Sequence, residues 1–164
     1  MKIAKEKKFL IPLIILLLLG FGSITISFKD FLFTTRYYRT PLKAYNAGSG
    51  YNAILGDTSA DKEMGLCQLD DTTALFLGEI RQNLFVVDEM QSKNGKYVSK
   101  GLSFFYDLEE ESDGPNKNTT QTESQTVSWS ILYTRAEVEN AVDVKRVETY
   151  THSGGQKIYL VVFN

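Results

Sequence analysis

The feature that most constrains this chain is a segment of twenty consecutive uncharged residues, 9–28. Apart from Pro12, the first half of the segment consists of Leu, Ile and Phe. A helix rises about 1.5 Å per residue, so this length spans roughly 30 Å, which is the thickness of a bilayer's hydrocarbon core. A helix buried in a soluble core would need a polar face, whereas the segment offers only Ser23, Thr25 and Ser27. We therefore expect residues 9–28 to form a transmembrane anchor.

A cleaved signal peptide is the alternative interpretation of this segment. Such a peptide has a basic start, an apolar run of about 7–15 residues and small residues before the cut. Residues 9–19 would serve as the run, but no Ala-x-Ala pattern follows and apolar residues continue to Phe28. A retained anchor is therefore favoured. A lipoprotein anchor is disfavoured because the only cysteine, Cys67, comes much later in the chain.

Basic patches flank the apolar segment on both sides. Residues 1–8 carry a net charge of +3, and so do residues 29–43. Lys and Arg are enriched on the cytoplasmic side of membrane helices. The amino-terminal patch is the more compact, so we expect residues 1–8 to be cytoplasmic and the long C-terminal part to lie outside the cytoplasm. Residues 29–43 then form a basic juxtamembrane stem, which either lies against anionic lipid headgroups or is simply solvated.

The remaining residues, 44–164, are enough for one globular domain and carry a net charge of −8. This acidic balance argues against a nucleic-acid partner, which normally requires a basic excess. Hydrophobic residues make up 43% of the whole chain, which excludes disorder by composition. With one Cys and one His, an intramolecular disulfide and a metal site built from two histidines are also excluded.

Turn and strand signals in residues 44–164 predict an α+β fold that leans to all-β, with one mainly antiparallel sheet and one or two short helices. Thr40-Pro41 is typical of a helix start and predicts a short helix over 41–46. The strongest hairpin signal is Lys93-Asn94-Gly95-Lys96, because Asn-Gly readily takes the positive φ angles of a type I′ turn.

Three further signals lie near the C-terminus. Alternation over residues 127–133 predicts a strand with one apolar face. Thr134 and Glu137 have the spacing of a capping box, which predicts one or two helical turns. Residues 144–151 and 157–163 then predict a terminal hairpin whose turn contains His152.

Residues 109–126 contain no large apolar residue, and their polar and acidic side chains predict a flexible loop. Acidic clusters occur at Asp70-Asp71 and over residues 107–114, but neither has the spacing of an EF-hand calcium loop. We interpret both as solvated charge runs and assign no metal site and no cofactor. Asn118-Thr119-Thr120 matches the N-glycosylation pattern, which matters only in a eukaryotic secretory pathway.

Cys67 and His152 are the only thiol and imidazole in the chain. A thiol nucleophile needs a nearby base and usually a third group that orients the base. The neighbours of Cys67 match no nucleophile motif, so we expect a buried apolar filler there and a solvated turn residue at His152, and we assign no catalytic residue. Two alternatives stay open: catalysis by this pair, and an intermolecular disulfide through Cys67.

Residues 93–98, 129–133, 143–148 and 158–163 together resemble small exported proteins of Gram-positive bacteria, many of them tethered by a single helix or a lipid and without an assigned function. In those proteins a Gly often follows the Tyr, where this chain has Thr134. The resemblance implies an envelope location and a sheet-rich domain, and it brings no catalytic residues with it.

These features predict a non-enzymatic, single-pass protein of the cell membrane. Its partners would be the lipid bilayer and, through the domain outside the cytoplasm, another protein or component of the envelope. One alternative is an envelope hydrolase that uses Cys67 with His152, or acids distant in sequence. Another is an accessory or sensory subunit whose membrane helix pairs with a larger membrane protein.

Overall fold

The computed structural model describes residues 36–48, 58–110, 112–114 and 117–164. A compact unit extends from Tyr37 to Asn164. The segments predicted as the cytoplasmic end (1–8) and the anchor (9–28), and residues 29–35 of the basic stem, lie outside the described residues. No helix within the described part of the chain is long and apolar enough to cross a membrane.

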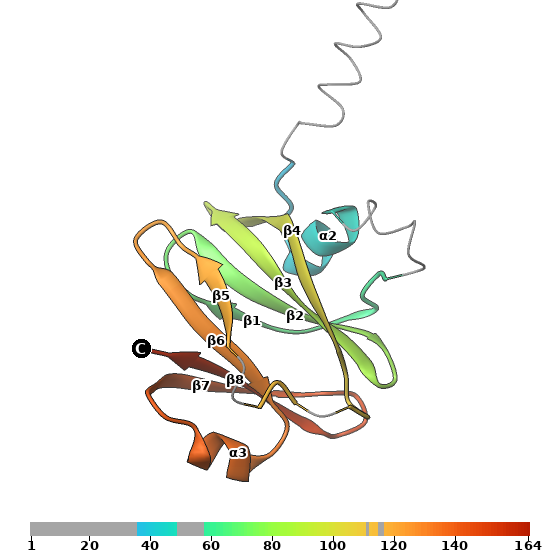
Figure 1. Ribbon diagram of the computed structural model, residues 1–164. Helices are drawn as coiled ribbons and strands as arrows, with labels where there is room; N and C mark the ends of the chain where they lie inside the picture. Colours follow the sequence, from blue (N-terminus) through green and yellow to red (C-terminus); the bar gives the residue numbers. More distant parts are fainter. Residues whose placement is uncertain (1–35, 49–57, 111, 115–116) are drawn as a thin grey trace, which may run out of the picture. The chain divides into compact units, whose positions relative to one another are not determined.

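The described residues form eight antiparallel strands in two four-stranded sheets (Figure 1). The first sheet is a meander in the order β1-β2-β3-β4, and the second has the order β5-β6-β8-β7. The strands are β1 (Lys62–Gln68), β2 (Thr73–Arg81), β3 (Leu84–Lys93), β4 (Lys96–Asp107), β5 (Asn118–Gln121), β6 (Thr126–Leu132), β7 (Val144–Thr151) and β8 (Lys157–Phe163); the helices are α2 (Pro41–Gly48) and α3 (Arg135–Asn140).

The predominance of antiparallel strands confirms the predicted lean to all-β. The prediction of one sheet needs correction, because the strands divide into two sheets that pack face to face. The division lets both sheets bury an inner face in one shared core, as in other β-sandwiches. Members of this core come from both sheets, among them Leu75, Leu77, Phe85 and Val87 from the first and Val127, Trp129, Ile131, Ile158 and Leu160 from the second.

Each helix covers the outer face of one sheet. Tyr45 of α2 packs on Phe76 of β2, with ring centroids 5.6 Å apart. On the other side of the domain, Val138 of α3 packs against Leu132 and Phe163 of the second sheet. Both outer faces therefore carry a small apolar cluster in addition to the core between the sheets.

The local turn predictions are confirmed. The N-cap of α3 is Thr134, whose hydroxyl accepts from the Glu137 backbone while the Glu137 carboxylate accepts from the Thr134 backbone, which is the predicted capping box. The helix predicted over 41–46 extends to Gly48. Strands β7 and β8 have the predicted bounds.

The β3–β4 turn provides a direct test of backbone conformation. Asn94 has a φ of 51° and Gly95 a φ of 67°, as a type I′ turn requires. A Cβ added at Gly95 would meet no atom within 4 Å, so the only cost of a side chain there is the strain of the positive φ angle. We expect Gly95→Ala to lower the free energy of unfolding by about 1 kcal/mol, measured by urea titration. Gly154→Ala is the matched control, because Gly154 has no positive φ; equal losses in both variants would contradict the explanation.

The loop predicted over 109–126 also needs correction. Strand β5 lies within it and pairs with β6, with Thr120 opposite Val127. No apolar residue marks this strand in the sequence. Its inward residue is Thr120, which is only 1% exposed and is held by hydrogen bonds rather than by apolar packing.

Candidate functional site

Cys67 lies on β1 with its side chain in the core between the sheets, and it is fully buried. A guanidinium nitrogen of Arg146 donates to its Sγ at 3.0 Å and to the Gln68 carbonyl at 2.6 Å. Burial, followed by the negative charge of Glu148, raises the pKa of Cys67 to about 12. The residue is therefore a neutral thiol at physiological pH, whereas nucleophilic attack requires a thiolate.

His152 is not the solvated turn residue that the sequence predicts, because it is only 2% exposed. The β7–β8 turn folds against β2, and the buried partner is Glu79. His152 Nε2 lies 3.4 Å from Glu79 Oε1, and Nδ1 accepts from the Gly154 backbone at 3.2 Å. The hydroxyl and backbone N–H of Ser153 both donate to the Glu79 carboxylate. These contacts fix the turn to the first sheet.

The structure does not bring Cys67 and His152 together. Cys67 pairs with Leu75 on β2, whereas His152 contacts Glu79. Glu79 lies four positions after Leu75, which corresponds to roughly 13 Å along a strand. Proton transfer between a nucleophile and its base requires a hydrogen bond of about 3 Å. The serine beside His152 does not replace the thiol, because its hydroxyl donates to Glu79 and not to the imidazole.

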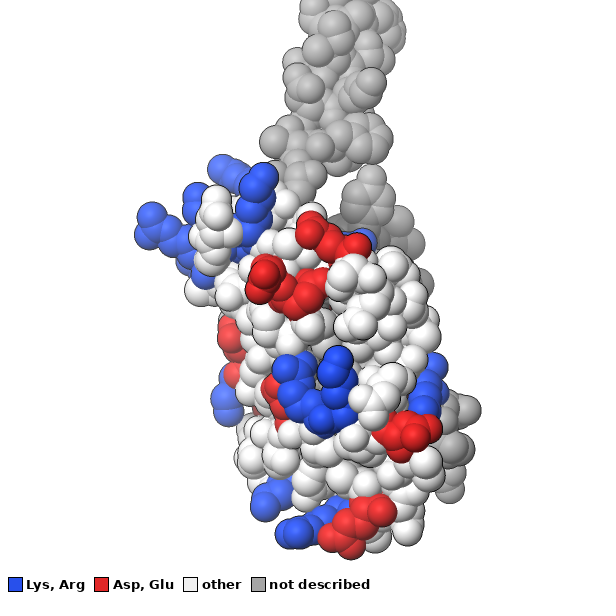
Figure 2. Space-filling model, turned by 90° about the vertical axis from the view of Figure 1, so that its left-hand side faces the viewer, with Lys and Arg blue, Asp and Glu red and all other residues white. Residues whose placement is uncertain are grey.

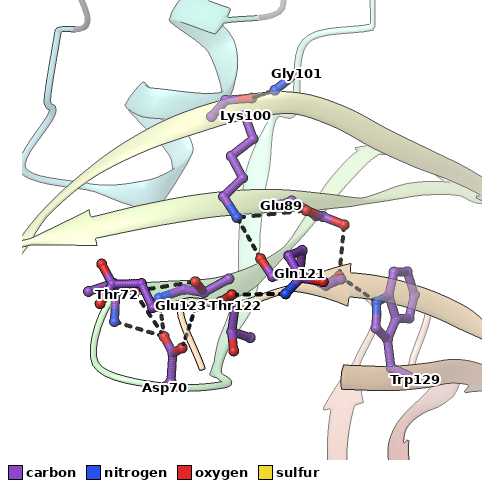
Figure 3. A network of polar contacts seen from close by, with 12 residues as sticks. Asp70, Thr72, Glu89, Lys100, Gly101, Gln121, Thr122, Glu123 and Trp129 are labelled. Carbon is purple, nitrogen blue, oxygen red and sulfur yellow. Dashed lines mark hydrogen bonds and ion pairs between the residues drawn. The ribbon is translucent and has the colours of Figure 1, made fainter. Parts of the chain in front are cut away.

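A buried polar network joins the two sheets at β3, β5 and β6 (Figure 3). The Thr120 hydroxyl donates to Glu89 Oε1 at 2.7 Å and accepts from the Trp129 indole at 2.8 Å. Lys100 Nζ lies 4.0 Å from the second oxygen of Glu89 and donates to the Gln121 carbonyl at 3.2 Å. Since Glu89 is only 3% exposed, this network is a structural link between the sheets and not an open site.

The acids that we interpret as solvated runs also have structural roles. Asp70 Oδ1 accepts from the backbone of Thr72 at 2.9 Å and of Thr73 at 2.7 Å, which closes the β1–β2 turn. Its burial raises the pKa, but hydrogen bonds from the Thr72 backbone, the Thr122 side chain and the Thr73 backbone outweigh this effect and lower the pKa to about 2.

Asp113 has a similar role in the second cluster. Its Oδ2 accepts from the Tyr106 hydroxyl at 3.0 Å, the Asn118 amide at 3.1 Å and the Ile131 backbone at 3.0 Å. The Asn118 amide is the group that glycosylation would modify, and here it is already in hydrogen bonds. Among the residues that the structure describes, no three His, Cys, Asp or Glu side chains are grouped to hold a metal ion.

The second sheet carries a pocket of about 380 Å³ beside α3, which we name the α3 pocket. Its floor is apolar, formed by Leu132 and Phe163. At its edge Val142 is 72% exposed, more than any other large apolar residue in the described part of the chain. The complete lining is Gly114, Lys117, Leu132, Glu137, Asn140, Ala141, Val142 and Phe163.

Two charged side chains line the α3 pocket, and only one of them is free to bind. The Glu137 carboxylate accepts from Ser112 and from Thr134, so it is already used by the capping box. Lys117 is exposed, and its Nζ lies 3.9 Å from the centroid of the Phe163 ring. It forms no ion pair with any described residue. The pocket therefore combines apolar surface with one available cation, which is suited to an apolar group that carries an acid.

Lys117, Val142 and Phe163 could not be recognised as site residues from the sequence, because they belong to three segments that only the fold brings together. One local signal was present. Val142 is an apolar residue in the short connection between α3 and β7, where a polar residue is expected, and it precedes Asp143, whose φ is 64°. Single exposed apolar residues are common on protein surfaces, so this signal alone does not mark a binding site.

Comparison with protein-family models, with curated proteins and with solved structures found no match. We therefore base the function on the residues of this chain.

Proposed function

We propose that the chain is a non-enzymatic, single-pass membrane protein whose domain, outside the cytoplasm, binds another protein of the cell envelope through the α3 pocket. The observation that carries the proposal is that exposed Val142 and Lys117, which forms no ion pair among the residues that the structure describes, line the same apolar pocket. Residues 9–28 supply the anchor. The partner is expected to present an apolar side chain next to a carboxylate.

The chemistry of the pocket supports this choice of partner. Burying one large aliphatic or aromatic side chain against Leu132 and Phe163 would contribute roughly 1.5–3 kcal/mol. A carboxylate beside Lys117 would be partly desolvated there, which strengthens its attraction to the ammonium group. A basic partner would be repelled by Lys117, so the pocket discriminates by charge as well as by shape.

The envelope-hydrolase alternative has less support. Its thiol is neutral and buried, and its imidazole lies at the far end of β2 from that thiol. The buried acids Glu79 and Glu89 already accept hydrogen bonds from Ser153 and Thr120. A binding function, in contrast, needs only the exposed surface around the α3 pocket.

Site-specific photo-crosslinking of the full chain in its own cell membranes tests the proposal. With benzoylphenylalanine at position 142 we expect one discrete adduct, which Lys117→Glu should reduce about tenfold or more because a like charge would then face the partner's acid. The same probe at Val147, an exposed valine on β7, is the positional control, and Lys157→Glu is the charge control. An adduct that forms equally at both positions, or that persists in Lys117→Glu, would overturn the proposal.

A further inference from the structure

We infer that the domain has a basic surface at the end where its first residues lie, and that this surface lies on the headgroups of an anionic bilayer. This surface, the basic end, consists of Arg39, Lys43, Lys93 and Lys96, all of them exposed. The inference rests on the anchor in the proposed function and adds the lipid class that the domain itself contacts.

The fold brings these cations together from distant parts of the sequence. Tyr38 and Tyr97 form an isolated antiparallel bridge, in which each backbone N–H donates to the other's carbonyl at 2.7 Å. The neighbouring Tyr37 hydroxyl donates to Gln91 at 3.3 Å. The bridge places Arg39 next to the start of β4, and therefore next to Lys96.

The charges at the basic end are uncompensated within the domain. Lys93 and Lys96 are direct register partners in the β3–β4 ladder, an arrangement that destabilises a hairpin when no anion is present. None of the four cations forms an ion pair among the described residues. Figure 2 shows Lys and Arg side chains gathered at the upper end of the domain, with acidic side chains beside and below them.

Acids on the adjacent turns do not cancel this surface. The Thr72 carbonyl accepts from the Ser92 backbone, so the β1–β2 turn with Asp71 stops level with Ser92. The β3–β4 hairpin continues past that level to Lys93 and Lys96, so its backbone extends further than the β1–β2 turn.

An anionic membrane is the partner that fits this position. Tyr37 is covalently joined to the stem that follows the expected anchor, so the domain's entry end is held near the bilayer. Half-buried Tyr37, Tyr38 and Tyr97 occur at the same end, and Tyr is enriched at membrane–water interfaces. Basic side chains within a Debye length of about 10 Å are attracted to anionic headgroups. Residues 44–164 carry a net charge of −8 even with Lys93 and Lys96 included, so the rest of the domain is acidic and is repelled from such a surface. This repulsion favours a single orientation.

Amine acetylation of the full chain, read residue by residue by mass spectrometry, tests the inference. The chain is placed in nanodiscs of phosphatidylcholine alone or of phosphatidylcholine mixed with phosphatidylglycerol. We expect Lys93 and Lys96 to react at least roughly fivefold more slowly in the anionic discs, whereas Lys62 and Lys157, exposed elsewhere on the domain, keep their rates. Salt at about 1 M should remove the difference, because the Debye length then falls to about 3 Å.

A pair of matched variants makes the test specific. In anionic discs, the double variant Lys93→Gln/Lys96→Gln should weaken the protection of Lys43 against acetylation. The double variant Lys62→Gln/Lys157→Gln should leave that protection unchanged. Protection by free inorganic phosphate in neutral discs would show a general phosphate site and overturn the lipid assignment. If the chain inserts into anionic discs but Lys93 and Lys96 react as fast as Lys157, this inference alone is overturned. If the chain does not insert into the discs, the proposed anchor is overturned as well.

Discussion

Replacing Thr120 by Val is expected to lower the free energy of unfolding by about 3 kcal/mol. The two side chains have nearly the same shape, so the change removes the hydroxyl and little packing. Glu89 then loses its hydrogen-bond donor and the Trp129 indole loses its acceptor, while both groups stay buried. Each buried polar group left without a partner costs about 1–3 kcal/mol.

Urea unfolding of the full chain in mild detergent measures this loss, with the fluorescence of the single Trp, Trp129, as the signal. Thr119→Val is the matched control, because Thr119 is the exposed neighbour on the same strand. We expect it to change stability by less than about 0.5 kcal/mol. Similar losses in the two variants would mean that β-strand propensity, and not the buried network, determines the result.

Replacing Asp88 by Asn is expected to remove a pH dependence of stability and to stabilise the domain at neutral pH. Asp88 is fully buried on the outer face of the first sheet, where its Oδ1 accepts from the Ser103 hydroxyl at 2.5 Å. Burial raises the pKa of Asp88 to about 6, although the hydroxyls of Ser103 and Ser99 oppose the rise. Asn keeps the size and a hydrogen-bonding carbonyl but carries no charge.

The direction in which stability changes with pH follows from the two pKa values of this carboxyl. In the unfolded chain it loses its proton near pH 4, and in the folded domain near pH 6. The contribution of Asp88 to the free energy of unfolding is therefore complete below pH 4, falls as the pH rises to 6, and is absent above pH 6. The whole contribution amounts to about 3 kcal/mol. The difference in the free energy of unfolding between the wild type and Asp88→Asn should therefore grow by about 3 kcal/mol between pH 4 and pH 7.

Unfolding titrations across this pH range measure the difference. Asp71→Asn is the control, because Asp71 is exposed, and its difference from the wild type should stay near zero at every pH. A constant difference between wild type and Asp88→Asn from pH 4 to pH 7 would show that Asp88 stays ionised in the folded domain.

The sequence predicted the elements whose signals are local. Asn94-Gly95 determines its own turn through backbone conformation, and the Thr134–Glu137 capping box fixes the start of α3 with groups only three residues apart. The division into two sheets was not predictable in this way. It depends on β5 pairing with β6 and not with β4, its other neighbour in sequence, and on β8 pairing with both β6 and β7. The β6–β8 pairing is a non-local choice.

The errors at single residues share a physical origin. Polar side chains usually indicate exposure, yet Thr120 and His152 are buried. Each lies against an acid distant in sequence, since Thr120 donates to Glu89 and His152 lies beside Glu79. Cys67 was correctly expected to be buried, since a cysteine with apolar neighbours needs no partner to be stable in a core. The α3 pocket was missed because its residues become neighbours only after the second sheet has formed.

If the domain is tethered as we propose, the Tyr38–Tyr97 bridge has a mechanical consequence. A pull on the stem reaches Tyr38 before it reaches α2, because Tyr38 precedes that helix in the chain. The two backbone hydrogen bonds of the bridge therefore take the load first and pass it to β4, the longest strand of the domain. While the bridge holds, α2 is shielded from tension, and the buried face around Tyr45 and Asp88 stays closed.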